Sequence, residues 1–201
     1  MITRKYKIAD KVVEVNSIYD EVHEYCADYL TNEPADYSVT TTQADIDFER
    51  EKSAREDEIE GIPIRHFSDS YLEELAAYRK IAEKMLDFDT VLFHGSVVAV
   101  DGVGYLFTAK SGTGKSTHTR LWREYFGERA VMVNDDKPLL YIADTVTAYG
   151  TPYNGKHRLG TNTSVPLKAI CILTRSADLQ FCDLFHLFGN SYRCSHNSSS
   201  F

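Results

Sequence analysis

The spacing of apolar and polar positions divides the first part of the chain into short strands and two helices. Residues 4–15 predict two strands around an Ala-Asp turn, and the β-branched run at residues 37–42 predicts a third. Apolar residues at helical spacing predict a helix over residues 17–30, with Ser17 as its N-cap. A stronger pattern, with serines before it and acids in its first turn, predicts a helix over residues 68–86.

The pattern changes after Asp89, where longer apolar runs are separated by glycine turns. Residues 90–100 and 103–110 predict two strands joined by an Asp-Gly turn, the strongest short hairpin signal. The amphipathic run 114–126 predicts a helix that ends at Gly127. Further strands are predicted at residues 129–136, 138–142, 145–153 and 167–175.

Charge is distributed unevenly along the chain. Residues 1–90 hold 11 Lys and Arg against 22 Asp and Glu, whereas residues 91–201 hold 11 against 8, within a net charge of −8. The overall acidity argues against a general nucleic-acid binder. The net positive charge of residues 91–201 makes that half the one compatible with binding a polyanion. Two interpretations of the first half stay open, an acidic solvated surface and an acidic docking face. Within it, the dense charge of residues 43–61 predicts an exposed helix or a mobile connector.

Composition also limits the compartment and the partners. The chain has no run near the ~18 apolar residues that a membrane helix needs, and its first residues lack the apolar segment of a secretory signal. Its four cysteines are irregularly spaced and form no CxxC pair, which suits free thiols in a reducing compartment. We therefore expect a cytoplasmic protein without a membrane or nucleic-acid partner, and a homo-oligomer is left open.

The glycine-rich run AKSGTGKS, residues 109–116, predicts a phosphate-binding loop. Small residues let consecutive backbone N–H groups turn toward phosphate oxygens, while a lysine and a hydroxyl serve the β/γ-phosphates and Mg²⁺. Here Lys115 supplies the charge and Ser116 the metal ligand, at the start of a helix whose dipole favours anions. Ala109 replaces the first consensus glycine. The candidate nucleotide-binding residues are Ser111, Gly112, Thr113, Gly114, Lys115, Ser116 and Thr117.

Two adjacent acids, Asp135 and Asp136, end the strand that is predicted after this helix. A carboxylate at such a strand end is suited to sit beside the Mg²⁺ that Ser116 would hold, so Asp135 is the second candidate metal ligand. The neighbouring carboxylate could accept the proton of an attacking hydroxyl. A solvated Asp-Asp-Lys-Pro turn is the alternative.

The run from residue 93 to the paired acids resembles the catalytic domain of HPr kinase/phosphorylase and its relatives, within the phosphoenolpyruvate carboxykinase-like P-loop group. It reads FHGSVVAVDGVGYLFTAKSGTGKSTHTRLW and then VMVNDD, and the likeness extends over residues 91–142. In that family a His-Gly opens a strand, a hairpin leads into the P-loop, and a strand ends in paired aspartates. The resemblance implies an α/β fold, a P-loop-containing mixed sheet of this type with a small N-terminal α+β region. We accordingly expect an acidic accessory region at residues 1–88, a nucleotide-binding core at 89–175 and an atypical tail at 176–201.

The resemblance assigns roles to further residues. His94 would lie near the reacting phosphoryl group, and Asp135 and Asp136 would supply a metal contact and the general base. A lone histidine in an apolar strand is more often a hydrogen-bonded core residue, and that alternative stays open. Lys156 and Arg158 flank His157 after a glycine turn and are candidates for neutralising transition-state charge, or else two exposed cations.

These features lead to one expected function and two rivals. The expected activity transfers the γ-phosphoryl group of a nucleoside triphosphate, ATP with Mg²⁺, to a hydroxyl of a protein or small molecule. The rivals are an ATP-binding regulatory module without turnover and a carboxykinase-like lyase. The family's downstream Glu-x-Arg-Gly-x-Gly signature is absent, and TPYNGKHRLG at residues 151–160 stands in its place. This departure argues against HPr itself as the phosphoryl acceptor.

Overall fold

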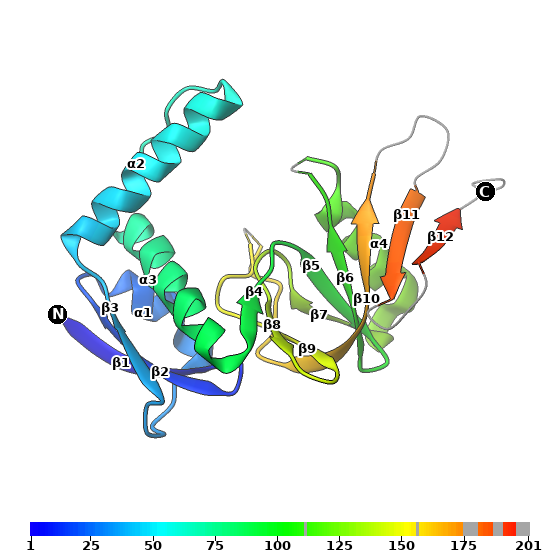
Figure 1. The fold of residues 1–201 in the computed structure, drawn as a ribbon, viewed down its shortest axis with the longest axis horizontal. Coiled ribbons are helices and arrows are strands. Elements are labelled where there is room, and N and C mark those ends of the chain that lie inside the picture. Colours follow the sequence, from blue (N-terminus) through cyan, green and yellow to red (C-terminus); the bar gives the residue numbers. More distant parts are fainter. Residues whose placement is uncertain (111, 156, 175–180, 187–190, 196–201) are drawn as a thin grey trace. The chain divides into compact units, whose positions relative to one another are not determined.

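The computed structural model describes residues 1–110, 112–155, 157–174, 181–186 and 191–195, the last two ranges as strands. The chain divides into two compact units, residues 1–88 and 89–201 (Figure 1). Each unit combines helices with strands, so the fold is mixed α/β. Among the described residues, no helix has the length and apolar character needed to cross a membrane.

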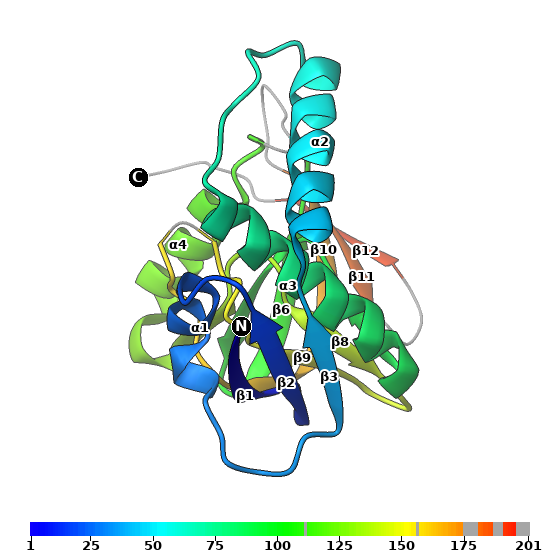
Figure 2. The same cartoon turned by 90° about the vertical axis from the view of Figure 1, so that its left-hand side faces the viewer.

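The first unit contains a small three-stranded sheet. β1 (Ile2–Ile8) pairs antiparallel with β2 (Lys11–Ser17), and β3 (Tyr37–Thr40) pairs parallel with β2 on its other side (Figure 2). The turn between β1 and β2 places Ala9 and Asp10 at φ angles of 49° and 61°, the left-handed pair that a two-residue hairpin needs. The predicted strands and their Ala-Asp turn are therefore confirmed.

Helix α3 (Asp69–Met85) packs against β2 and β3 and forms the main helical part of this core. It begins as predicted, because the Ser68 hydroxyl accepts a hydrogen bond from the Tyr71 N–H at 3.3 Å. Leu72 and Ile81 are fully buried on its inner face. The 3₁₀ turn η2 (Leu86–Phe88) ends the unit.

The densely charged segment forms an exposed helix, α2 (Gln43–Glu60), which Gly61 ends at a φ of 69°. Ion pairs join it to α3. The guanidinium of Arg79 lies 2.7 Å from a carboxylate oxygen of Glu49 and 3.4 Å from one of Asp45. The sequence left a helix and a connector open, and the structure shows the helix.

The helix predicted over residues 17–30 is mostly wrong. Ser17 ends β2, where it pairs with Ile2, so it cannot cap a helix. α1 covers only Glu21–Tyr25 and is followed by the 3₁₀ turn η1 (Ala27–Tyr29). Strand pairing with β1 therefore prevailed over the helical spacing of the apolar residues.

The second unit is built on one mixed sheet. Its strands follow the order β4-β8-β9-β10-β6-β5-β7, and β11 and β12 continue from β10 (Figure 1). The pair β10 and β6 is parallel, and the other described pairs are antiparallel. The strands are β4 (Thr90–Leu92), β5 (Ser96–Val100), β6 (Val103–Thr108), β7 (Ala130–Asn134), β8 (Leu139–Ile142), β9 (Val146–Tyr149), β10 (Ser164–Leu173), β11 (Phe181–His186) and β12 (Ser191–Ser195).

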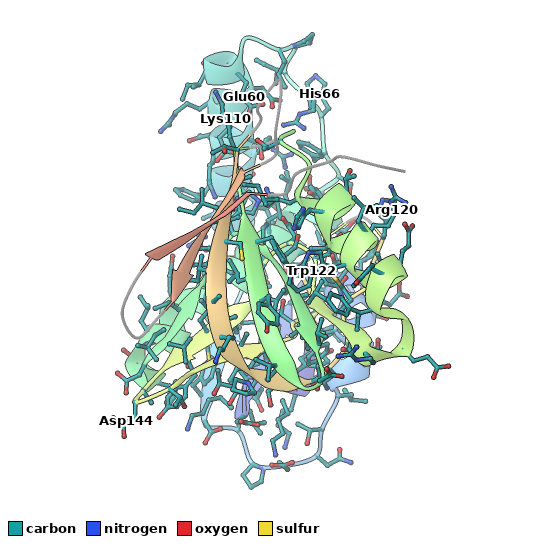
Figure 3. All side chains as sticks on the ribbon, turned by 90° about the vertical axis from the view of Figure 1, so that its right-hand side faces the viewer. Glu60, His66, Lys110, Arg120, Trp122 and Asp144 are labelled. Atoms are coloured by element: carbon teal, nitrogen blue, oxygen red, sulfur yellow. The ribbon has the colours of Figure 1, made fainter. Side chains whose placement is uncertain are left out.

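Helix α4 (Lys115–Phe126) lies across one face of this sheet (Figure 3). The Trp122 ring, on its inner side, has its centroid 5.1 Å from the Tyr105 ring and 5.0 Å from the Phe107 ring. Gly127 ends α4 at a φ of 57° and begins the 3₁₀ turn η3 (Gly127–Arg129). The helix and the β5–β6 hairpin, with its Asp101-Gly102 turn at φ angles of 52° and 78°, are confirmed.

The prediction of a single strand over residues 90–100 is wrong in one respect, because residues 93–95 interrupt it and separate β4 from β5. The Phe93 N–H donates to the Pro138 carbonyl, and the Gly95 N–H donates to the Asp136 carbonyl at 2.9 Å. A Cβ on Gly95 would lie 2.9 Å from the Phe107 carbonyl oxygen, so only glycine fits there. β4 pairs with β8 and β5 with β6 and β7, which leaves His94 in the connection between them.

Candidate functional site

Three segments of the second unit meet at one edge of its sheet. β6 and β7 are both antiparallel to β5, which lies between them, so both end at the edge where β5 begins. The glycine-rich loop follows β6, Asp135 and Asp136 follow β7, and His94 precedes β5. With neighbouring strands about 4.8 Å apart, the ends of β6 and β7 are roughly 10 Å from each other. The topology therefore brings the predicted phosphate-binding and acidic segments together.

Two glycines in the connection between β6 and α4 have left-handed backbone conformations. Gly112 and Gly114 have φ angles of 73° and 112°, a region that L side chains rarely adopt. The Thr113 N–H donates to the Lys110 carbonyl, which forms a tight turn before α4. The Lys115 ammonium donates to the Ala109 carbonyl at 3.3 Å, so it reaches back across the loop. Ser111, also predicted as a site residue, lies outside the described residues.

Ser116 and Thr117 follow in the first turn of α4. Because the first N–H groups of a helix have no partners within the helix, this turn presents donors and the positive end of the helix dipole to the loop. The Gly114 carbonyl already accepts the first helical hydrogen bond, from the His118 N–H at 2.9 Å. The start of α4 thus offers the N–H donors and the positive dipole end that favour an anion.

Asp135 is the buried member of the acidic pair, with 8% of its surface exposed. The Ser96 hydroxyl lies 3.0 Å from Asp135 Oδ1 and 2.9 Å from the Asp135 carbonyl oxygen. Burial raises the pKa of the Asp135 carboxyl, and the neighbouring Asp136 raises it further. The Ser96 hydrogen bond opposes this rise, as do the positive charges of His157 and Arg123. Nearby cations and a buried, destabilised carboxylate are features of functional acids.

Asp136 is the accessible member, and His94 stands beside it. The His94 Nε2 atom lies 3.3 Å from Asp136 Oδ1, with 64% of the histidine side chain and 36% of the aspartate side chain exposed. The Thr108 hydroxyl donates to the His94 carbonyl at 3.0 Å, which ties the histidine to the end of β6. The exposure rules out the alternative that His94 is a core residue. The structure places His94 beside Asp136.

The connection between β9 and β10 lies against β7 and beside the paired acids. Thr161 donates from its N–H to the Val133 carbonyl, and a Cβ on Gly150 would lie only 1.9 Å from the Thr161 carbonyl oxygen. At Gly155 an added Cβ would be 3.5 Å from Asp136 Cβ and 3.8 Å from Asp135 Oδ2. A side chain at position 155 would therefore touch both acids, which places Gly155 beside them.

Arg158 follows Gly155 closely and has a φ of 47°, a strained conformation for a side chain of this size. Its N–H donates to the Gly155 carbonyl at 3.3 Å. The structure thus places Arg158 in the turn that lies beside the acids. Lys156, its predicted partner, lies outside the described residues.

Sequence reasoning missed the residue that ties this loop to the acids. Asn134 is fully buried at the end of β7, and its Oδ1 accepts hydrogen bonds from the Asp136 and Lys137 N–H groups at 2.9 and 2.7 Å. Its Nδ2 donates to the Thr151 hydroxyl at 2.9 Å. The available signal was a carboxamide at the end of an apolar strand, directly before paired acids. Ser96 was missed for a similar reason, as the polar start of an otherwise apolar strand.

The donor set fits a hard divalent cation better than a transition metal. Among the described residues, no group of three or more His, Cys, Asp or Glu could hold a metal ion. The oxygen atoms available are the two carboxylates of Asp135 and Asp136, hydroxyls such as that of Ser116, and carboxamide oxygens. Mg²⁺ is characteristically held by one or two carboxylates together with substrate phosphates and water. The residues present are therefore compatible with Mg²⁺ that arrives with a nucleotide.

The chain was compared with protein-family models and with curated protein sequences. No protein-family model matches it, and no curated protein sequence matches it. The functional assignment therefore rests on the geometry of the site.

Proposed function

We propose that the protein is an ATP-dependent phosphotransferase that transfers the γ-phosphoryl group to a hydroxyl of a protein or small molecule. The observation that carries the proposal is the pairing of His94 with Asp136, 3.3 Å apart, at the sheet edge where the glycine-rich loop also ends. An accessible carboxylate beside a phosphate-binding turn has the arrangement that deprotonation of an attacking hydroxyl requires.

The glycine-rich loop would hold the nucleotide phosphates. Backbone N–H groups of residues 114–117 would donate to phosphate oxygens at the positive end of α4. Lys115 now donates to a carbonyl of its own loop, and a phosphate would offer its ammonium a stronger, charge-assisted partner. Ser116 and Asp135 would hold Mg²⁺, which when bound neutralises charge on the β- and γ-phosphates.

The two aspartates would have different roles, metal binding and proton acceptance, because they differ in exposure. Asp135 is buried and held by Ser96, which suits a fixed metal ligand. Asp136 is reachable from solvent and would take the proton of the acceptor hydroxyl. His94, beside Asp136, would orient this carboxylate and receive or share the proton.

The loop at residues 155–158 would supply positive charge to the reacting phosphoryl group. Gly155 lies beside both acids, and Arg158 follows in a strained turn. A guanidinium there would neutralise charge that develops on the phosphoryl oxygens. The acidic first unit would serve as an accessory region for the acceptor or for a partner protein.

The test is calorimetric titration of the full chain with ATP and Mg²⁺, followed by an assay for γ-phosphoryl transfer to hydroxyl-bearing peptides and small molecules. Lys115→Ala should weaken nucleotide binding by about 100-fold or more, because a charge-assisted hydrogen bond contributes up to about 3 kcal/mol. Lys168→Ala, at an exposed position of β10, is the matched control and should bind like the wild type. Equal affinity of the wild type and Lys115→Ala would contradict the proposal, and tight MgATP binding without transfer would favour a regulatory module.

A further inference from the structure

The small sheet of the first unit has one covered edge and one open edge. β1 forms the covered edge, because the Thr31 N–H donates to the Lys5 carbonyl at 3.0 Å and Leu30 forms an isolated bridge with Tyr6. β3 forms the other edge, and β2 is its only neighbour among the described strands. An unpaired edge offers main-chain groups to any other strand, so folded proteins usually cover or block it. The open edge at β3 is therefore a candidate interaction surface.

The hydrogen bonds of β3 show which of its main-chain groups face outward. The Thr41 N–H donates to the Asn16 carbonyl in β2 at 3.0 Å, so the Thr40 carbonyl, on the opposite side of the same trans peptide, points away from β2. The Lys80 ammonium donates to that carbonyl at 2.7 Å from outside the sheet. Because main-chain direction alternates along a strand, the Ser38 N–H, the Ser38 carbonyl and the Thr40 N–H also point outward. Among the described residues, no backbone group outside the sheet hydrogen-bonds to these three groups.

A groove of about 440 Å³ lies beside this edge. One wall consists of residues 38–40, and the other is formed by α3, which packs against β3 (Figure 2), and by η2. Lys80, Glu83 and Lys84 line the helical wall from one face of α3, and Asp87 follows them in η2. Proteins that bind peptides by strand addition use the main-chain groups of an open edge for affinity and the space beside it for side chains. β3 and its groove provide both.

The charges around the groove indicate which segment fits it. Three cations and four carboxylates lie in the groove or are ion-paired with its lining: Arg79, Lys80, Lys84, Asp45, Glu49, Glu83 and Asp87. Each cation lies within 4 Å of at least one carboxylate, so an acidic segment would have to displace a pair. The side chains of Glu83 and Asp87 are 60% and 69% exposed, which makes them the accessible carboxylates of the set. A segment with Lys or Arg side chains therefore matches the groove.

The charge of the whole first unit argues against a second copy of this chain as the occupant. Residues 1–90 hold 22 Asp and Glu against 11 Lys and Arg. Two copies that met edge to edge at β3 would bring two such surfaces together, and their like charges would repel. The same field attracts a cationic segment of another protein.

We propose that β3 binds an extended, basic segment of a partner protein as a fourth strand of the small sheet. The main chain of the segment pairs with the outward groups of Ser38 and Thr40. Alternate side chains of an added strand face opposite sides of the sheet. Lys or Arg side chains on one side lie over Glu83 and Asp87, and small hydroxyl side chains on the other side lie beside the exposed Ser38 and Thr40. This inference concerns the first unit alone and holds whether or not the second unit transfers phosphoryl groups.

The experiment is a fluorescence anisotropy titration of the full chain against a labelled nine-residue peptide in which lysine and threonine alternate. We expect saturable binding. The same peptide N-methylated at every peptide nitrogen keeps its charges but has no main-chain donors, and it should bind at least tenfold more weakly. A peptide in which glutamate and threonine alternate should also bind at least tenfold more weakly, because it meets the carboxylates of the groove.

Variants of the chain locate the binding site. Ser38→Pro removes an outward N–H, and proline is tolerated at an edge position of this kind, so affinity for the lysine peptide should fall at least fivefold. The double variant Glu83→Gln and Asp87→Asn should weaken binding about threefold or more, as expected for the loss of two exposed charge pairs. Glu51→Gln with Glu56→Gln changes the net charge equally at exposed positions of α2 and should bind like the wild type.

Three outcomes would each overturn the inference: no saturable binding of the lysine peptide by the wild type, equal affinities for the parent and N-methylated peptides, or wild-type affinity in Ser38→Pro. A dimer that is detected by light scattering and dissociated by Ser38→Pro would also overturn it, because a second copy would then occupy the edge. If Ser38→Pro does not fold, as judged by thermal melting, the N-methylated peptide and the charge variants decide the outcome.

Discussion

The Nε2 atom of His94 lies 3.3 Å from Oδ1 of Asp136, although β5, β6, α4 and β7 separate the two residues along the chain. Two further contacts hold the pair in place. The Gly95 N–H donates to the Asp136 carbonyl, and the Thr108 hydroxyl donates to the His94 carbonyl. The backbones of both residues are thus fixed, while both side chains remain open to solvent. This combination suits residues that act on a substrate.

Replacing the accessible carboxylate should separate binding from transfer. In Asp136→Asn the amide cannot accept the hydroxyl proton, so we expect phosphoryl transfer to fall by about 10²- to 10⁴-fold. Nucleotide affinity should stay within about threefold of the wild type, because the glycine-rich loop is unchanged. Calorimetry with MgATP and a steady-state transfer assay measure the two quantities. Asp144→Asn, in the exposed β8–β9 turn, is the control (Figure 3), and unchanged turnover in Asp136→Asn would refute the base assignment.

The buried link between Asn134 and Thr151 should be sensitive to loss of one hydroxyl. Thr151→Val keeps the shape but deprives the Asn134 Nδ2 of its 2.9 Å acceptor. We expect the free energy of unfolding to fall by about 1–3 kcal/mol, because the substitution also removes the hydrogen bond that the Thr151 hydroxyl donates to the Lys137 carbonyl at 2.9 Å. Thr151→Ser restores the hydroxyl and should recover most of this loss. Chemical denaturation followed by the fluorescence of Trp122, the single tryptophan, measures the effect within the second unit.

The same pair of variants tests whether the link positions the acids. If it does, Thr151→Val should reduce the rate of phosphoryl transfer while its Kd for MgATP remains that of the wild type, and Thr151→Ser should restore the rate. Equal transfer rates in the valine and serine variants would show that the link serves stability alone.

Arg158 offers a test of strain retained for function. Its φ of 47° lies in the left-handed region, which costs about 1–2 kcal/mol for a residue with a Cβ. Arg158→Gly relieves that strain but loses roughly 0.5–1 kcal/mol through the greater freedom of glycine in the unfolded chain. We therefore expect the free energy of unfolding to be unchanged or higher by up to about 1.5 kcal/mol, together with slower transfer. A loss of stability above about 1 kcal/mol would instead assign the arginine side chain a structural role.

In the first unit, His23 should make stability depend on pH. Burial lowers the pKa of the His23 imidazole below its usual value of 6.5. The neutral ring is fully satisfied, with its Nδ1 atom 2.7 Å from the Tyr6 hydroxyl and its Nε2 atom 2.9 Å from the Ser17 hydroxyl. Because the unfolded chain binds the proton more readily, stability should be lost as the pH falls below about 6.5.

Hydrogen exchange of the β1 and β2 amides between pH 7.5 and 5.5, corrected for intrinsic rates, measures this dependence locally. His23→Asn should be less stable at pH 7.5 but should show a flatter profile. His66→Asn removes an exposed histidine from another segment and should keep the wild-type profile (Figure 3). A wild-type slope in His23→Asn would mean that other groups cause the pH dependence.

The sequence by itself determined the features that depend on neighbouring residues. The Asp101-Gly102 turn has its own backbone preference, and so do the glycines at 112 and 114. A serine cap before α3 was also predicted, and the structure shows that it is Ser68. Helices α3 and α4 follow from apolar positions that recur at the helical period. These signals are local, so they can be recognised without knowledge of the rest of the fold.

Only the tertiary structure decided which of these segments meet. The order of strands places β5 between β6 and β7, and this order brings His94 and Ser96 to the acids. The same cause explains the wrong predictions, since pairing with β1 keeps Ser17 in a strand and the hydrogen bond from Gly95 to Asp136 breaks the strand predicted over residues 90–100.

The hydrogen bonds of Asn134 could not be predicted from the sequence either. Its bond to Thr151 depends on the path of the segment after β9, which brings Thr151 to the end of β7. The sequence alone does not identify the hydrogen-bond partner of a carboxamide side chain. The sequence therefore determined the chemical groups and their local shapes. The register and order of the sheet decided which of those groups form a site, because contacts between distant residues are set by strand pairing and not by local preference.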